Sequence, residues 1–201
     1  MQKAVVTYQG SVEGLQEELY FKHLQNLINN SDEFSKRVSF KFKNVNGGFA
    51  SNVVHKAKIY SSTDNLKVAV FDHDFKDDEF IKAIHDCKKY NIFPAYSIIS
   101  FNLFLILHKQ DYNRITTPDD NYLKDLRRIY KIDSKMHIKS EEGCLKIIKQ
   151  ITLEDVKIAI KRAKKLNDSS MRFKKEIIKD VYEQPFLNIN KFVEQVFLEI
   201  R

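Results

Sequence analysis

The stretch KVAVFDHD, residues 67–74, joins a short apolar run to two aspartates that are one residue apart. The run is rich in Val and lacks alternation with polar residues, which predicts a buried strand over residues 67–71. Asp72 and Asp74 follow its carboxyl end, where open α/β sheets bind ligands, and side chains two apart on an extended chain point the same way. Because Mg²⁺ and Mn²⁺ both prefer oxygen ligands, the pair predicts a Mg²⁺ site, with Mn²⁺ as a second candidate. The alternative is that acids here, including those at 77–79, only stabilise the start of the next helix.

Strands and helices alternate throughout the first half of the chain. Further strands are predicted over residues 4–8, 38–43 and 92–96, and each strand is followed by a helical pattern. This order predicts an α/β fold, a mainly parallel sheet flanked by helices, over residues 1–108. The alternating pattern of the second strand and the proline inside the last one favour edge positions for both.

The turn after the first strand is expected at residues 9–11, because Gly10 permits backbone angles that other residues resist. In a parallel sheet this turn and the aspartate pair lie at the same edge. Gln9 and Gly10 are therefore expected to converge with Asp72 and Asp74.

The second half, residues 109–201, reads as a basic helical part packed on the α/β core. It carries 21 Lys and Arg against 15 Asp and Glu, whereas residues 1–108 carry 13 against 12. This imbalance favours a polyanion partner such as RNA or DNA, although a solvated lysine-rich surface explains it equally well. The same two interpretations apply to a helix that presents four neighbouring cations, which would contact a phosphate backbone: Lys161, Arg162, Lys164 and Lys165.

Composition excludes several classes of protein. The chain of 201 residues is 43% hydrophobic with 5 Gly and 3 Pro, which excludes a disordered or fibrous protein. No apolar run approaches a membrane span, so no membrane partner is expected, and the N-terminus lacks the form of a signal peptide. Cys87 and Cys144 have no metal-ligand spacing and are expected to be reduced core residues of a cytoplasmic protein.

Five segments, which span residues 9–21, 68–74, 97–108, 159–166 and 184–189, together resemble the RloB-like family, small phage-defence proteins built on a Toprim domain. The family pattern E-G-x-x-T-E-x-x-Y-F is matched in its latter half by QEELYF, residues 16–21, with Gln9 and Gly10 placed at its start and a three-residue insertion between. The strand ending in D-x-D matches residues 68–74. The pattern S-N-P-x-F-E-x-W-L-L-L-H is matched by SIISFNLFLILH, residues 97–108. AIKRAKKL, residues 159–166, and loosely residues 184–189 match two further family segments.

This resemblance implies a Toprim-type, metal-dependent nuclease that acts as a toxic effector and is controlled by an ABC-type ATPase partner. In that scheme the first-strand glutamate and the D-x-D pair hold Mg²⁺, which neutralises charge on the phosphate and activates water. Glu17 keeps its family position, either as a site residue or as an acid in the first turn of a helix. Whether the chain forms a homo-oligomer is left open.

Two carboxylates of the family pattern are absent, because Gln9 and Asn102 stand where glutamates are expected. An amide can ligate Mg²⁺ but carries no charge and cannot act as a base. Three explanations are open: Gln9 is a deliberate replacement, Glu13 or Glu17 substitutes for the missing carboxylate, or catalysis is lost and binding retained. The last explanation gives the alternative function, a degenerate Toprim protein that binds a partner protein or nucleic acid without cleavage.

Two histidines are expected to be structural. His73 lies between the aspartates and should point to the opposite side of the strand. His108 ends an apolar helix, where a core or capping role is favoured over a catalytic one.

Overall fold

A computed structural model of the chain describes residues 3–59, 66–112, 119–174 and 186–201. Its four strands are β1 (Val5–Val12), β2 (Arg37–Asn44), β3 (Leu66–Asp72) and β4 (Ile92–Ser97), and they form one parallel sheet in the order β2-β1-β3-β4. The predicted parallel α/β fold is therefore confirmed. The two strands predicted at edges, β2 and β4, are the edges of this sheet.

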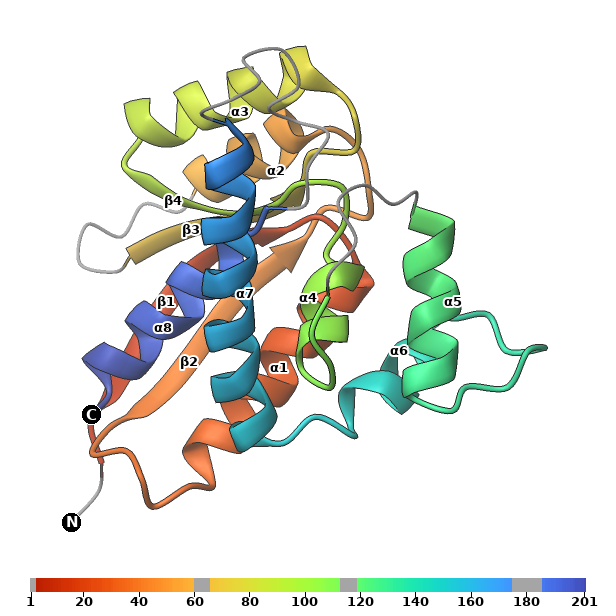
Figure 1. Ribbon diagram of the computed structural model, residues 1–201. Helices are drawn as coiled ribbons and strands as arrows, with labels where there is room; N and C mark the ends of the chain where they lie inside the picture. The colour runs from red at the N-terminus through yellow and green to blue at the C-terminus, as the bar shows by residue number, and fades with distance from the viewer. Residues whose placement is uncertain (1–2, 60–65, 113–118, 175–185) are drawn as a thin grey trace.

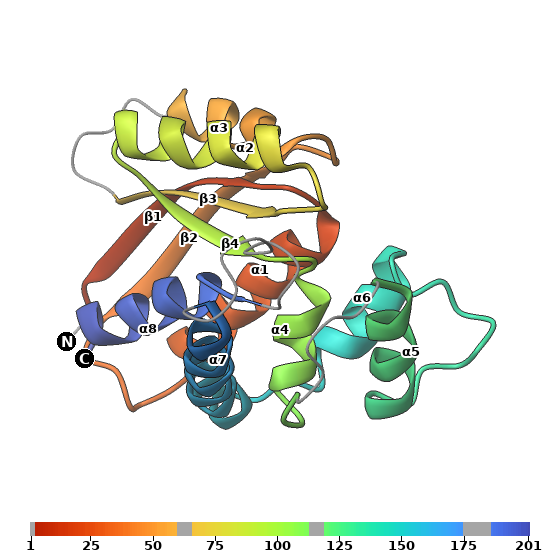
Figure 2. The same ribbon diagram turned by 45° about the horizontal axis from the view of Figure 1, so that its top comes forward.

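Helices occupy both faces of the sheet and the region beside it (Figures 1 and 2). The helices are α1 (Leu15–Asn29), α2 (Ala50–Lys58), α3 (Asp77–Lys89), α4 (Asn102–Leu107), α5 (Asp119–Ile129), α6 (Glu141–Ile148), α7 (Leu153–Lys174) and α8 (Ile189–Glu199). Helices α2 and α3 cover one face, and α1 and α8 cover the other. Helices α4 to α7 lie beyond α1 and α8, outside the layer that contacts the sheet. No helix in the described ranges is both long enough and apolar enough to span a bilayer.

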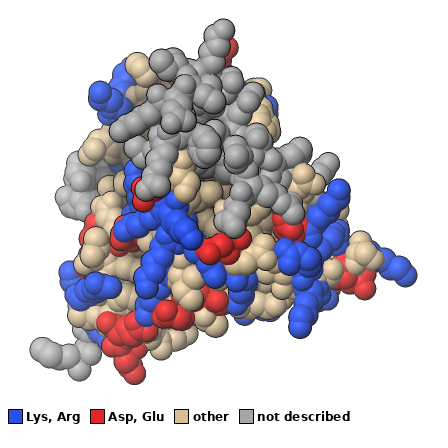
Figure 3. All heavy atoms as spheres, in the orientation of Figure 1, with Lys and Arg blue, Asp and Glu red and all other residues tan. Residues whose placement is uncertain are grey.

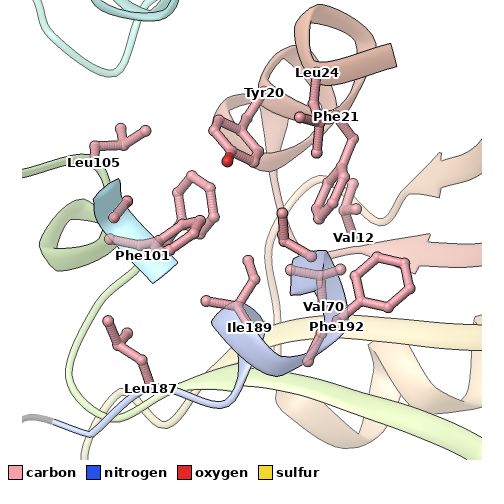
Figure 4. Close-up of a cluster of buried hydrophobic side chains, with 14 of the residues drawn as sticks. Val12, Tyr20, Phe21, Leu24, Val70, Phe101, Leu105, Leu187, Ile189 and Phe192 are labelled. Carbon is pink, nitrogen blue, oxygen red and sulfur yellow. The ribbon is translucent and has the colours of Figure 1, made fainter. Parts of the chain in front are cut away.

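The C-terminal helix is part of the central core. The Phe192 ring of α8 packs edge-on against Tyr8 of β1, with 5.5 Å between ring centroids, and also contacts Phe21 of α1 (Figure 4). One continuous set of buried apolar side chains includes residues from both halves of the chain. Near residue 108 the alternation of strands and helices thus gives way to helices alone, and both parts of the chain contribute to the same core. Cys87 and Cys144 are free and buried within it.

The predicted turn at residues 9–11 is wrong, because β1 continues through these residues to Val12. Gly10 pairs with Val68 of β3, and a Cβ at Gly10 would lie 1.8 Å from the Val68 carbonyl oxygen. Gly10 is needed for the close approach of two strand backbones, which is a common reason for a glycine inside a strand. β1 therefore ends at Val12, and the residue that follows it, Glu13, lies four residues beyond Gln9.

A candidate active site at the carboxyl edge of the sheet

An open pocket of about 200 Å³ lies at the carboxyl edge of the sheet. It draws residues from the segments that follow all four strands and from the loop between α5 and α6. The lining residues are Glu13, Gly14, Leu15, Gln16, Glu17, Gly47, Asp72, Asp74, Ser100, Asn102 and Lys139. Four of these are carboxylates, namely Glu13, Glu17, Asp72 and Asp74.

Glu13 connects the ends of the two central strands. Its Oε2 accepts a hydrogen bond of 2.9 Å from the Asp72 backbone N–H, and its own N–H donates to the Val70 carbonyl at 3.0 Å. Because β1 and β3 are adjacent and parallel, Glu13 and Asp72 lie close to each other at the carboxyl edge of the sheet. The geometry therefore places the Glu13 carboxylate against the backbone of Asp72, beside the pocket that both residues line.

Asp72, the last residue of β3, and Asp74 both line the pocket, but the backbone leaves the extended conformation at Asp74. Asp74 and Phe75 have φ angles of 49° and 55°, in the left-handed region that non-glycine residues seldom adopt. Asp72 Oδ2 accepts a hydrogen bond of 2.9 Å from the Phe101 N–H, just before α4. Rare backbone angles of this kind cluster at functional sites, where the surrounding structure maintains them.

Glu17 stabilises the start of a helix and also lines the pocket. In the first turn of α1, its Oε2 accepts a hydrogen bond of 3.1 Å from the Gly14 N–H, which stabilises the start of the helix. The same side chain is buried and lines the pocket. Helix capping and a site role are thus compatible.

The carboxylates raise one another's pKa values. Burial, and then the charges of Asp74 and Glu17, raise the pKa of Glu13 to about 7, although the Asp72 N–H and Lys76 oppose the shift. Burial and the charges of Glu13 and Glu17 raise the pKa of Asp72 well above its ordinary value. Burial likewise raises the pKa of Glu17. Burial and mutual repulsion thus favour the protonated forms of these carboxylates, an effect that a bound cation would oppose.

The donor set suits a hard divalent cation in its chemistry, because carboxylate oxygens from Glu13, Asp72 and Asp74 face one pocket. Within the described ranges, no group of three His, Cys, Asp or Glu side chains has a geometry that could hold a metal ion as placed. Two of the carboxylates are instead hydrogen-bonded to backbone N–H groups. Coordination would therefore require side-chain rotations that exchange these bonds for a cation.

Gln9 is not brought into this site. It lies inside β1, paired with Lys41 and Lys67, and does not line the pocket. The dipeptide Glu13-Gly14 lies where the family pattern places its first glutamate and glycine, at the end of the first strand. Glu17, Tyr20 and Phe21 then follow with one residue fewer than the pattern, and no three-residue insertion is needed. The alignment of the first family glutamate with Gln9 assumes a turn at Gly10, where β1 in fact continues.

Tyr20 and His108, which belong to two of the family patterns, meet in the core. Tyr20 Oη lies 3.1 Å from His108 Nε2, and His108 Nδ1 lies 2.8 Å from the Phe104 carbonyl oxygen. A carbonyl only accepts hydrogen bonds, so Nδ1 carries the proton and Nε2 accepts from the tyrosine. Burial lowers the pKa of His108 to about 4, which keeps the ring neutral. His73, the second histidine expected to be structural, is buried on the α3 side of the sheet edge, away from the pocket. Its ring lies edge-on to Phe80 of α3.

Lys139 is a pocket residue that sequence reasoning missed. It comes from the loop before α6, and its charge lowers the pKa of Glu17. The only sequence signal was general, the excess of cations in the second half. Its place beside the carboxylates depends on how the α5–α6 segment packs against α1, which no local pattern encodes.

The four cations predicted on α7 differ in their surroundings. Arg162 donates to the Leu107 carbonyl at 2.8 Å and pairs with Asp111 at 3.1 Å, so it joins α7 to the end of α4. Lys164 pairs with Glu194, and Lys165 lies 4.0 Å from Asp111. Lys161 is exposed. Figure 3 shows Lys and Arg side chains over α7 and α5 with acidic side chains among them, so this face is mixed in charge.

A family model described as RloB-like protein matches residues 11–196, nearly the whole chain. No curated protein matches the chain, and no solved structure matches it.

Proposed function

Because the chain belongs to the RloB-like family, we propose that it is a metal-dependent nuclease of the Toprim type that cleaves RNA or DNA phosphodiester bonds. The observation that supports this most strongly is the convergence of Glu13, Asp72 and Asp74 at the carboxyl edge of a parallel sheet. Carboxylates held so close that burial and mutual repulsion raise the pKa values of two of them are typical of sites that bind a cation.

In this proposal Glu13, Asp72 and Asp74 hold Mg²⁺ or Mn²⁺. Bound there, the ion would neutralise charge on the scissile phosphate and lower the pKa of a water molecule. Glu17 faces the same pocket and can accept a proton from the attacking water. Lys139 supplies positive charge that can contact a phosphate oxygen, and Ser100 and Asn102 offer hydrogen bonds to the strand.

The test is a cleavage assay on RNA and DNA with Mg²⁺, Mn²⁺ or a chelator. Asp72→Asn and Asp74→Asn are each expected to lower cleavage by at least about a hundredfold, because loss of even an outer partner of a metal site costs about 10–100-fold. Asp78→Asn, which removes an exposed acid from the first turn of α3, is the matched control and should cleave normally. Unchanged cleavage in folded Asp72→Asn and Asp74→Asn proteins would refute the proposal.

We further propose that the nuclease is the effector of an anti-phage system and is restrained by an ABC-type ATPase partner. This part rests on the family resemblance alone. A gene for such an ATPase beside this one would support it, and so would toxicity of the chain expressed by itself that disappears when the ATPase is co-expressed. Toxicity that Asp72→Asn leaves unchanged would argue against it.

Binding without cleavage is the second candidate, and one observation favours it. Asn102 stands where the family pattern has a glutamate, and its amide donates a hydrogen bond of 3.0 Å to Ser100 Oγ. If this missing carboxylate is what silences the site, Asn102→Glu should raise Mg²⁺-dependent cleavage strongly. If the wild-type protein cleaves and Asn102→Glu does not increase the rate, this candidate is excluded.

A further inference from the structure

Two aromatic rings are exposed at the same edge of the sheet as the pocket. Among the large apolar side chains exposed in the described ranges, the two aromatic ones are Phe49, 45% exposed, and Phe75, 58% exposed. Phe49 directly precedes α2 in the segment that begins with Gly47, a pocket residue, and Phe75 directly follows Asp74, another pocket residue. In both ribbon views the segments before α2 and α3 lie at the carboxyl edge of the sheet (Figures 1 and 2).

The Phe75 ring is mostly exposed, and its inner contact is edge-to-face with the buried His73 ring, with 6.1 Å between centroids. Asp74 and Phe75 both adopt left-handed angles, so one residue lines the pocket while the next leaves its ring exposed to solvent. Left-handed angles are unfavourable for non-glycine residues, and two consecutive ones lie here beside the pocket. Burying the ring in the core would have been the more stable arrangement for a phenylalanine.

A lysine lies near both the Phe49 ring and the carboxylates. Lys76 Nζ lies 4.8 Å from the centre of the Phe49 ring, in a cation–π arrangement, and Lys76 follows Phe75 in the chain. Its charge also acts on Glu13, whose pKa it lowers. Aromatic rings beside a cation are the elements with which proteins bind single-stranded nucleic acid, through base stacking and phosphate contact.

We propose that Phe49, Phe75 and Lys76 form a rim that stacks an unpaired nucleobase next to the nucleotide whose phosphate enters the pocket. This inference rests on the proposed nuclease function and names its substrate class as a strand with unpaired bases. Stacking needs only the face of a base, so the rim would accept DNA and RNA alike, whereas a fully paired duplex would present no free base face.

The experiment measures binding by fluorescence anisotropy with Ca²⁺ in place of Mg²⁺ and confirms on a gel that the strand stays intact. The probes are a fluorescein-labelled oligothymidylate, the RNA oligonucleotide oligouridylate, and a DNA duplex that contains the first strand. Phe75→Ala and Phe49→Ala should each weaken binding of both single strands about tenfold, the order expected for one lost base stack. Phe75→Trp should bind at least as tightly as wild type. Ile81→Ala is the matched control, because it removes a 45% exposed apolar side chain from α3 outside the rim.

Single-strand affinities of Phe75→Ala and Phe49→Ala equal to wild type would overturn the inference, and normal cleavage by both variants would leave the nuclease proposal standing. An equal loss on single strands and duplex would also overturn it, since the rings would then contact something other than a free base. A wild-type protein that neither binds nor cleaves any of the probes would refute the nuclease proposal itself.

Discussion

Helices α1 and α4 both run from the carboxylate pocket into the apolar core, and their two ends differ in charge and hydrogen bonding. At the pocket end, Glu17 and Asn102 lie among acidic groups and next to backbone with left-handed angles. Further along the same helices, Tyr20 and His108 are buried and hydrogen-bonded to each other. Each of these two family patterns therefore contains residues that face the pocket and residues that join α1 to α4.

This difference predicts opposite effects of substitution. Changes at the pocket should reduce activity while leaving stability unchanged or higher, because they relieve repulsion between carboxylates. Changes at the Tyr20–His108 contact should reduce stability while leaving the chemistry of the folded protein intact.

The largest effect is expected at the end of β1. Glu13→Gln should lower Mg²⁺-dependent cleavage by about a hundredfold and leave the melting temperature equal or raised, because one of several crowded negative charges is removed. Gln9→Glu should leave cleavage unchanged, because residue 9 lies inside the strand and away from the pocket. A cleavage assay and a thermal melt of both variants check this. A strong gain of activity in Gln9→Glu would restore the alignment that places the first family glutamate at residue 9.

A smaller effect, on stability alone, is expected in the core. Tyr20→Phe removes the donor to His108 Nε2 and should lower the free energy of unfolding by about 1–3 kcal/mol, because a buried acceptor is left unsatisfied. Urea denaturation measures this loss, and kcat of the folded variant should stay within about twofold of wild type, a change of under about 0.5 kcal/mol in the barrier. A large fall in kcat without a loss of stability would show that Tyr20 acts in the site and does not merely join the two helices.

The smallest effect at neutral pH is expected at His108, where only the pH dependence of stability should differ. His108 has a folded pKa of about 4, lowered by burial from its ordinary 6.5, so the unfolded chain binds the proton more readily. Its contribution to stability is complete above pH 6.5 and is lost as pH falls through 4, by at most about 3 kcal/mol. Relative to His108→Gln, which stays neutral, wild type should lose stability across this range in urea denaturation.

The pocket carboxylates act in the reverse direction, since the folded pKa of Glu13 is raised to about 7. Their contribution makes the folded state more stable as pH falls through 7, because the folded protein then binds more protons than the unfolded chain. The comparison with His108→Gln cancels this effect, which both proteins share. Equal pH profiles for wild type and His108→Gln would contradict a neutral, buried His108.

The sequence predicted the parallel sheet, its two edge strands and the aspartate pair, because each depends on local periodicity and on the alternation of strands and helices. It did not predict that β1 continues through Gly10, since a glycine in a turn and a glycine at a close strand contact look alike in one sequence. Because of that ambiguity, the first glutamate of the family pattern was aligned with Gln9 instead of Glu13. Lys139 was missed because its position depends on packing between distant segments, which local patterns do not record.

The central claim is that Glu13, Asp72 and Asp74 together bind one divalent cation, and calorimetric titration of the wild-type protein with Mg²⁺ and Mn²⁺ tests it most directly. We predict one saturable site for each ion, a melting temperature that rises with ion concentration, and loss of both effects in Asp72→Asn but not in Asp78→Asn. Wild-type protein that takes up neither ion, or Asp72→Asn protein that binds as tightly as wild type, would contradict the claim.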